Sequence, residues 1–197
     1  MTKARDLATS GPASGLVAID PSSVAVGSGS YTISDNNVNF SNVSSVSLND
    51  IFTSSYENYN IKIELSAISI DCGLRFRFRA SGTDDSGGNY IGAYPAISYL
   101  NAAANNYSGA GATSHQFGTA DAGTSAHFYF SDIIINKPAV AVQTLHTLTF
   151  TAVLTPGGVT AGAGGGVHNN GSVFDGITFF PASGTFSGKV WVYGYRN

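Results

Sequence analysis

Residues 73–85 read "GLRFRFRASGTDD", and this stretch indicates the fold of the whole chain. Apolar residues alternate with arginines in the order Leu74, Arg75, Phe76, Arg77, Phe78 and Arg79. Successive side chains of a β-strand point to opposite faces, so a period of two places the apolar residues in a core and the arginines on the other face. The stretch therefore predicts a strand with one buried face, followed by a turn.

The same alternation recurs along the chain. Inward-facing sets are predicted at Tyr59, Ile61, Ile63 and Leu65, at Ala126, Phe128 and Phe130, and at His146, Leu148, Phe150, Ala152 and Leu154. Residues 172–180 and 188–197 supply two further strands, and the separating segments are rich in Gly, Asn, Asp and Pro. No segment after residue 31 has a 3.6-residue apolar stripe. We therefore expect an all-β chain folded as an antiparallel β-sandwich of jelly-roll type.

The first 30 residues differ in composition from the rest. Residues 1–30 are rich in Ser, Gly, Ala and Pro and hold few large apolar side chains, so they cannot bury enough surface to fold alone. We expect an extended attachment arm over residues 1–30 and one head domain over residues 31–197, with a frayed terminus as the alternative. Candidate attachment residues in the arm are Lys3, Arg5, Asp6 and Leu7.

Two long loops are expected within the head domain. They span about residues 82–124 and residues 155–171, the second of which reads "TPGGVTAGAGGGVHNNG". Four tyrosines of the first loop are candidates for stacking on sugar rings of a receptor, namely Tyr90, Tyr94, Tyr99 and Tyr107. Ordinary packing is the alternative for these aromatic side chains.

Composition excludes several classes of function. The 197 residues are 11% charged with a net charge of −3, and no basic run offers the clustered cations that nucleic-acid binding requires. Cys72 is the only cysteine, so no internal disulfide is expected. No apolar run approaches the roughly 20 residues that cross a bilayer, and no apolar segment follows the basic residues at the N-terminus. We expect synthesis in a cytoplasm and no membrane insertion.

No motif for catalysis stands out. The histidines at 115, 127, 146 and 168 are scattered without metal-ligand spacing, and no nucleophile motif or phosphate loop accompanies them. We expect no enzyme, no cofactor and no metal site. Asp84 and Asp85, followed by "SGGN", leave one possibility open, a calcium ion in a loop, although a plain turn explains the same residues.

Two sets of residues are candidates for a subunit interface. The row Arg75, Arg77 and Arg79 either pairs with carboxylates of neighbouring strands or faces a partner, because arginine suits interfaces. In the terminal segment "KVWVYGYRN", aromatic residues alternate with valines, so the two faces of the predicted strand differ in composition. The aromatic side holds Trp191, Tyr193 and Tyr195, opposite Val190 and Val192. One side is expected in the core and the other against a neighbour, although both can also be covered within one chain.

Several segments together resemble tail-fibre and related receptor-binding virion proteins of tailed bacteriophages, especially cyanophage-like ones. They are "VSLNDIFTSSYENYNIKIEL" at 46–65, "LRFRFRASGTDDSGGNY" at 74–90, "VFDGITFFPASGTFSGKVWVYGYRN" at 173–197, and the opening "TKARDLA". The residues that match the family pattern are Phe52, Tyr56, Tyr59, Arg75, Arg77, Ser81, Gly82 and Asp84. The resemblance assigns them to the fold and not to binding.

The resemblance implies a virion structural protein, a short tail fibre or tip with a homotrimeric receptor-binding knob. It implies attachment to other virion proteins through the N-terminus and contact of distal loops with host-surface carbohydrate. Because the chain has no long shaft, heptads or repeats, a head-decoration protein on the capsid is the alternative. A secreted carbohydrate-binding module is a more distant one.

Overall fold

The computed structural model describes residues 15–34, 36–99, 104–122, 129–154 and 158–195. These residues form strands, turns and bends, and no helix occurs among them. In chain order the strands are β1 (Leu16–Ala18), β2 (Ser23–Val26), β3 (Ser30–Ser34), β4 (Asn37–Val43), β5 (Val46–Asn49), β6 (Asn58–Ile68), β7 (Cys72–Ala80), β8 (Thr83–Asp84), β9 (Tyr90–Ser98), β10 (Ala104–Ala112), β11 (His115–Ala120), β12 (Tyr129–Asn136), β13 (Thr144–Leu154), β14 (Gly158–His168), β15 (Gly176–Pro181) and β16 (Phe186–Tyr195).

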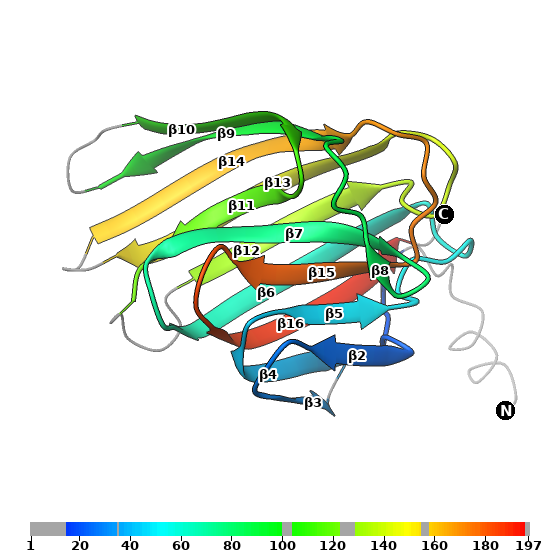
Figure 1. Ribbon diagram of the computed structural model, residues 1–197, viewed down its shortest axis with the longest axis horizontal. Coiled ribbons are helices and arrows are strands. Elements are labelled where there is room, and N and C mark those ends of the chain that lie inside the picture. Colours follow the sequence, from blue (N-terminus) through cyan, green and yellow to red (C-terminus); the bar gives the residue numbers. More distant parts are fainter. Residues whose placement is uncertain (1–14, 35, 100–103, 123–128, 155–157, 196–197) are drawn as a thin grey trace, which may run out of the picture.

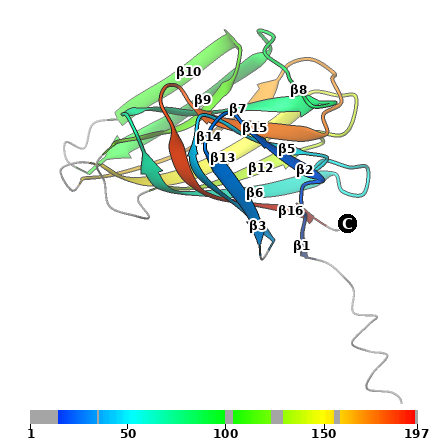
Figure 2. The same ribbon diagram turned by 60° about the horizontal axis from the view of Figure 1, so that its bottom comes forward.

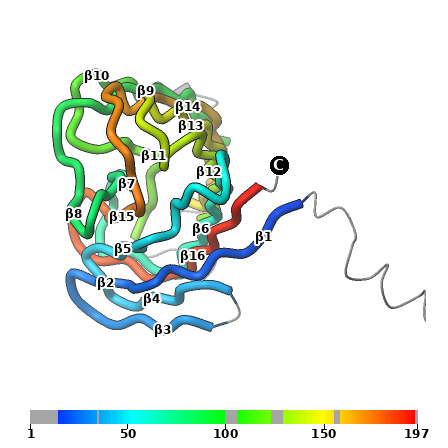
Figure 3. The backbone as a smooth tube through the Cα atoms, turned by 90° about the vertical axis from the view of Figure 1, so that its right-hand side faces the viewer, coloured from blue at the N-terminus to red at the C-terminus, as the bar shows by residue number. Residues whose placement is uncertain are grey.

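The strands form two antiparallel sheets that pack face to face (Figure 1). The ten-stranded sheet runs β10-β9-β14-β13-β12-β6-β16-β4-β3, with β1 beside β16. The six-stranded sheet runs β11-β7-β15-β5-β2, with β8 beside β7. The expected antiparallel β-sandwich is therefore confirmed, whereas its jelly-roll type stays a prediction. Figure 3 shows the two layers end-on, with β2 and β3 lying at the same side of the sandwich.

The alternating strands bury the faces that their sequences indicate. Leu74, Phe76 and Phe78 of β7 are fully buried, as is the inward row of β6 that begins at Tyr59. Val190 and Val192 of β16 also lie in the core, which leaves the aromatic row of that strand on the outer face. One inward assignment was wrong: Phe130 of β12 is 43% exposed, because Tyr129 takes the inward position. Ala126 and Phe128, predicted on the same face, lie outside the described residues.

The expected arm ends earlier than residue 30. β1 pairs with β16 in the ten-stranded sheet, and β2 pairs with β5 in the six-stranded sheet, so residues 16–26 belong to the sandwich (Figure 2). These strands are only three and four residues long, and they are ordered by pairing with strands elsewhere in the sequence. The attachment candidates Lys3, Arg5, Asp6 and Leu7 lie outside the described residues.

Both expected long loops are strands instead. Residues 90–98, 104–112 and 115–120 form β9, β10 and β11, and residues 158–168 form β14, which lies in the ten-stranded sheet between β13 and β9. The glycine content of β14 concealed this strand, because glycine gives no alternation of apolar and polar side chains.

The glycines of β14 make room for large side chains of its neighbours. A Cβ at Gly162 would lie 2.5 Å from Cε1 of Phe150, and a Cβ at Gly166 would lie 2.9 Å from Cε1 of His146. At Gly164 a Cβ would lie 2.3 Å from the carbonyl oxygen of Ala93 and 2.5 Å from Cβ of Tyr94. Rings from β13 and β9 therefore fill the space that side chains of β14 would otherwise occupy on the inner face.

We expect Gly164→Ala to destabilise the fold by about 1 to 3 kcal/mol, because the added carbon overpacks a site bounded by backbone. Urea denaturation of both proteins measures the change. Ala25→Val adds more volume at an exposed position of β2, in the other sheet, and should change the free energy of unfolding by less than about 0.5 kcal/mol. Equal effects of the two substitutions would contradict this account of β14.

Candidate assembly face

One end of the ten-stranded sheet carries no charge on its outer face. Four adjacent strands, β10, β9, β14 and β13, contain no Asp, Glu, Lys or Arg at any position. We call the outer face of these four strands the charge-free face. Surfaces of soluble monomers usually intersperse both signs of charge, so a face of this extent without charge favours contact with another molecule.

Large apolar side chains are exposed on the charge-free face. Ile97 of β9 is 61% exposed and Leu145 of β13 is 54% exposed. Others on the same face are Ile91, Val153 and Val159, with threonines at 147, 149 and 151 between them. Each of these residues occupies an outward position of its strand, so turning it inward would require a register shift of the whole strand.

The charge-free face is also hollowed. A shallow pocket of about 540 Å³ crosses β10, β9 and β14. Its lining consists of small or aliphatic residues, namely Ile91, Gly92, Ala93, Ser108, Gly109, Ala110, Gly166 and Val167. A hollow of this lining can receive an apolar side chain of a partner, but it offers no charged group to a small polar ligand.

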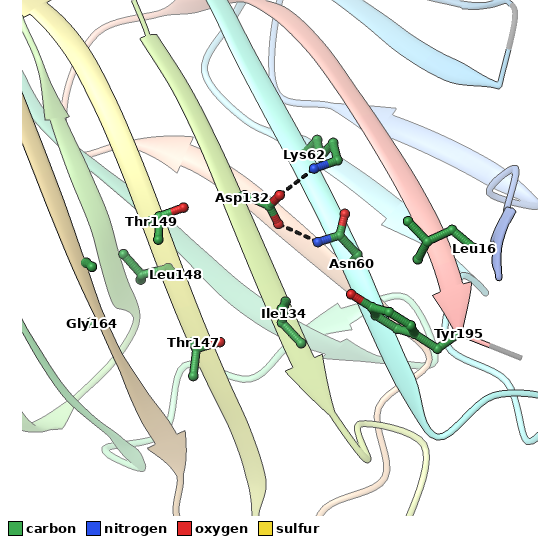
Figure 4. Close-up of a pocket in the computed structure, with 11 residues that line it drawn as sticks. Leu16, Asn60, Lys62, Asp132, Ile134, Thr147, Leu148, Thr149, Gly164 and Tyr195 are labelled. Carbon is green, nitrogen blue, oxygen red and sulfur yellow. Dashed lines mark hydrogen bonds and ion pairs between the residues drawn. The ribbon is translucent and has the colours of Figure 1, made fainter. Parts of the chain in front are cut away.

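A polar cluster borders the charge-free face on β6 and β12. Asp132 accepts a hydrogen bond from Nδ2 of Asn60 and forms an ion pair with Lys62, and Figure 4 shows its carboxylate between these two side chains. The Lys62 ammonium also lies 5.7 Å from the centroid of the Phe130 ring. The charges of the cluster are thus already paired within the chain.

The aromatic residues of β16 lie beyond this cluster. Tyr195 and Leu16 face each other across the β1–β16 pair, and both line a pocket of about 510 Å³ that also contacts Asp132 and Thr149 (Figure 4). Trp191 and Tyr193 stand on the same outer face and are half-buried. Their predicted contact with a neighbouring subunit stays a prediction.

The arginine row lies on the outer face of the other sheet. Arg79 is 8% exposed; its guanidinium donates to Ser47 Oγ at 2.8 Å and to Thr178 Oγ1 at 2.7 Å, and pairs with Asp84 at 2.5 Å. Arg77 donates through Nε to the carbonyl of Thr113 at 2.9 Å, and its guanidinium lies 4.8 Å from the Phe180 ring centroid. Arg79 therefore holds strands of its own chain together.

Arg75 and Arg77 remain half-buried, and the structure brings neither of them near Trp191, Tyr193 or Tyr195, which lie on the opposite sheet. The two sets of interface candidates cannot belong to a single continuous patch. On the outer face of the six-stranded sheet, Arg77 and Arg79 thus bond to groups of the same chain. The charge-free face has no such charged side chains.

The four tyrosine candidates occupy three different environments. Tyr90 is buried in the core with its ring stacked on Phe78, and its hydroxyl donates to the carbonyl of Asp85. It therefore presents no ring face to a sugar. Tyr99 is 81% exposed.

Tyr94 and Tyr107 stack on each other at 5.2 Å between ring centroids, and Gln116 Nε2 donates to the Tyr94 hydroxyl at 3.0 Å. They line a pocket of about 340 Å³ between the sheets, where Tyr94 itself is buried.

The candidate calcium ligands already have protein partners. Asp84 is paired with Arg79, and it accepts a hydrogen bond from Thr178 Oγ1 at 2.6 Å. Asp85 accepts from the backbone N–H of Gly87 at 2.8 Å, and its other oxygen lies 3.2 Å from Nε2 of His168. Among the described residues no group of three or more His, Cys, Asp or Glu is placed to hold a metal ion. The hydrogen bonds and ion pair of these two carboxylates stabilise the segment that follows β7.

Two core histidines lie face to edge without polar partners. The ring centroids of His115 and His146 are 4.1 Å apart, and each ring also lies against Phe76. Nε2 of His115 and both ring nitrogens of His146 are buried without a hydrogen-bond partner in the described part of the chain. Burial lowers the pKa of His115 to about 4, and burial together with the nearby His115 lowers the pKa of His146 well below its usual value.

Comparison with known proteins adds no assignment. No family model matches the chain, and no curated protein matches it. Across the described ranges, no helix is long and apolar enough to span a membrane.

We expect Arg79→Met to lower the free energy of unfolding by about 3 kcal/mol, because it leaves Asp84 and two hydroxyls without their cation. Arg77→Met, in which a half-buried arginine loses a bond to a carbonyl, should cost about 1 kcal/mol. Urea denaturation at neutral pH compares the two variants. An equal loss in both would mean that Arg79 has no special role in joining its strands.

We expect stability to fall as the pH drops from 7 to 5. In that range the unfolded chain takes up protons at histidines near pH 6.5, while folded His115 and His146 stay neutral. The free energy of unfolding then decreases by up to about 1.4 kcal/mol per pH unit for each histidine. Urea midpoints across this range measure the slope, and His146→Leu should make it shallower. An unchanged slope in His146→Leu would show that this histidine does not contribute.

Proposed function

We propose that this chain is a structural subunit that assembles with copies of itself through the charge-free face. The observation that supports this proposal is the absence of charge from four adjacent strands whose outward positions expose Ile97, Leu145 and other large apolar side chains. The cores of interfaces are depleted of charged residues in the same way.

Within this proposal we infer a homotrimer that belongs to a phage particle, as a short tail fibre or tip. The resemblance of residues 46–65, 74–90 and 173–197 to tail-fibre proteins supports this setting. A rigid sandwich with exposed apolar residues on regular strands suits a knob built from repeated subunits. Tyr99, the most exposed of the tyrosine candidates, remains available for a receptor glycan.

The test of assembly is the mass of the purified chain in solution, measured by light scattering or analytical ultracentrifugation. One chain has a mass of 20.3 kDa, and we expect a multiple of three chains. The double variant Ile97→Lys and Leu145→Lys should lose the trimer, because each lysine would have to be desolvated in the contact.

A matched control introduces the same charges elsewhere. Ile70 and Val173 are 49% and 52% exposed and lie outside the strands, so Ile70→Lys with Val173→Lys should leave the mass unchanged. A wild-type chain that stays single at high concentration would contradict the proposal, as would a face variant of unchanged mass.

The virion setting has a separate test, quantitative mass spectrometry of purified phage particles that contain the chain. A copy number matching the tail proteins supports the fibre or tip. A copy number matching the far more abundant head subunits supports the decoration protein instead. Absence from particles would reject both settings without affecting the self-assembly measured in solution.

A further inference from the structure

The free edge of β3 is regular and fully exposed. β3 ends the ten-stranded sheet and pairs with β4 alone, over five residue pairs without a register shift. All five residues, Ser30–Ser34, are exposed. A regular edge strand presents a row of backbone N–H and C=O groups that can pair with another strand.

The other edges of the described structure are protected by irregularity or by short length. The β10–β9 pair shifts register between Gly109 and Ala112, and the β11–β7 pair shifts between Gln116 and Gly118. β2 has four residues. Bulges and short strands are devices that discourage edge pairing, and charged residues are another. β3 has none of them, since Asp35 is the only charged residue between Ser22 and Asn49 and lies beyond the strand.

Two side chains of β3 point to the inner face of the ten-stranded sheet but are not covered by the six-stranded sheet. Tyr31 and Ile33 stand opposite Phe40 and Val38 of β4, which are buried at 3% and 2% exposure. Tyr31 and Ile33 themselves are 41% and 46% exposed, and Figure 3 shows their strand β3 lying beyond β2, the edge strand of the six-stranded sheet. The inner face of the larger sheet thus continues beyond the smaller one.

We propose that β3 pairs antiparallel with β3 of a second copy, about a two-fold axis through Thr32. This register pairs all five residues of the strand and places Tyr31 of each chain beside Ile33 of the other. An aromatic residue beside a β-branched one is a favourable cross-strand pair. An axis through Tyr31 or Ile33 instead would pair only three residues of each strand. It would also place Tyr31 opposite Tyr31, or Ile33 opposite Ile33.

The backbone fits the same register. Ser34 and Asn37 are opposite each other across a two-residue connection, so they form the hydrogen-bonded pair that closes the hairpin. Alternation along the ladder then points the backbone groups of Tyr31 and Ile33 to the free edge. In the proposed pairing, Tyr31 of each chain and Ile33 of the other form a hydrogen-bonded pair, and this pair occurs once on each side of the axis.

The edge contact is independent of the proposed function. A two-fold axis perpendicular to the sheet extends the ten-stranded sheet into the second copy and leaves the two charge-free faces on the same side. The face contact and the edge contact can therefore form together, and each can fail without the other.

Disulfide trapping tests the register. In a Cys72→Ser background, which removes the only cysteine, Thr32→Cys places the two thiols at the axis, with Cα atoms about 4.5 Å apart, within reach of a disulfide. Ser30→Cys is the matched control, because Ser30 faces Ser34 of the other chain and the two Ser30 positions are about 14 Å apart. We expect Thr32→Cys to run mostly as a dimer on non-reducing gels, and Ser30→Cys as a single chain. No dimer from Thr32→Cys, or equal dimer from both, would overturn the proposal.

A second measurement separates the edge contact from the face contact. In the Ile97→Lys and Leu145→Lys background, where the face is blocked, we expect the mass of two chains. Adding Ile33→Lys should reduce it to one chain, and adding Val142→Lys, a similarly exposed residue between β12 and β13, should not. A single chain before Ile33→Lys is added, or two chains after it, would overturn the edge contact and leave the proposed face contact standing.

Discussion

The structure depends on one packing constraint, the close approach of β14 to the rings on its two neighbours. Phe150 and His146 lie over β14 from β13, and Tyr94 lies over it from β9, because three inward positions of β14 are glycines without a side chain, at 162, 164 and 166. The ten-stranded sheet can then stay regular while its core holds large aromatic residues. The same regularity keeps the outward residues of β13, β14 and β9 in one continuous face.

The two outer faces of the sandwich have different chemistry. On the six-stranded sheet, Arg79 and Arg77 are bound to carbonyl, hydroxyl and carboxylate groups of their own chain. On the ten-stranded sheet, charge is confined to the strands around the Lys62–Asp132 pair, and the rest is apolar or uncharged polar. Arg77 and Arg79 of the opening motif thus join segments of their own chain, and the surface proposed for assembly carries no conspicuous motif.

Strands with large alternating side chains could be predicted from sequence, and strands of small residues could not. β6, β7 and β13 show the period of two directly, since Tyr59, Phe76 and Leu148 mark their buried faces. In β9 and β14, glycine, alanine and proline hide the alternation. In β12 both parities are apolar, and the inward assignment of Phe130 was wrong for that reason. β1 and β2 become strands only through distant partners, which no local pattern records.

The charge-free face could be anticipated only in part. Low overall charge was visible in the composition, but the gathering of uncharged residues required the order β10-β9-β14-β13, which brings together segments from two distant parts of the chain. The sequence left open which carboxylate pairs with the arginine row, and the pairing of Arg79 with Asp84 was not predicted. The bonds of Arg79 to Ser47 and Thr178 depend on sheet order, which no local pattern records.

A contact made through a surface without ions has a characteristic response to its medium. Salt has no fixed charge there to screen, so the association should persist from fresh water to brine. Cooling weakens the hydrophobic contribution instead, because burial of apolar surface is driven by entropy near room temperature. An assembly held by the charge-free face would thus tolerate changes of salinity and loosen in the cold.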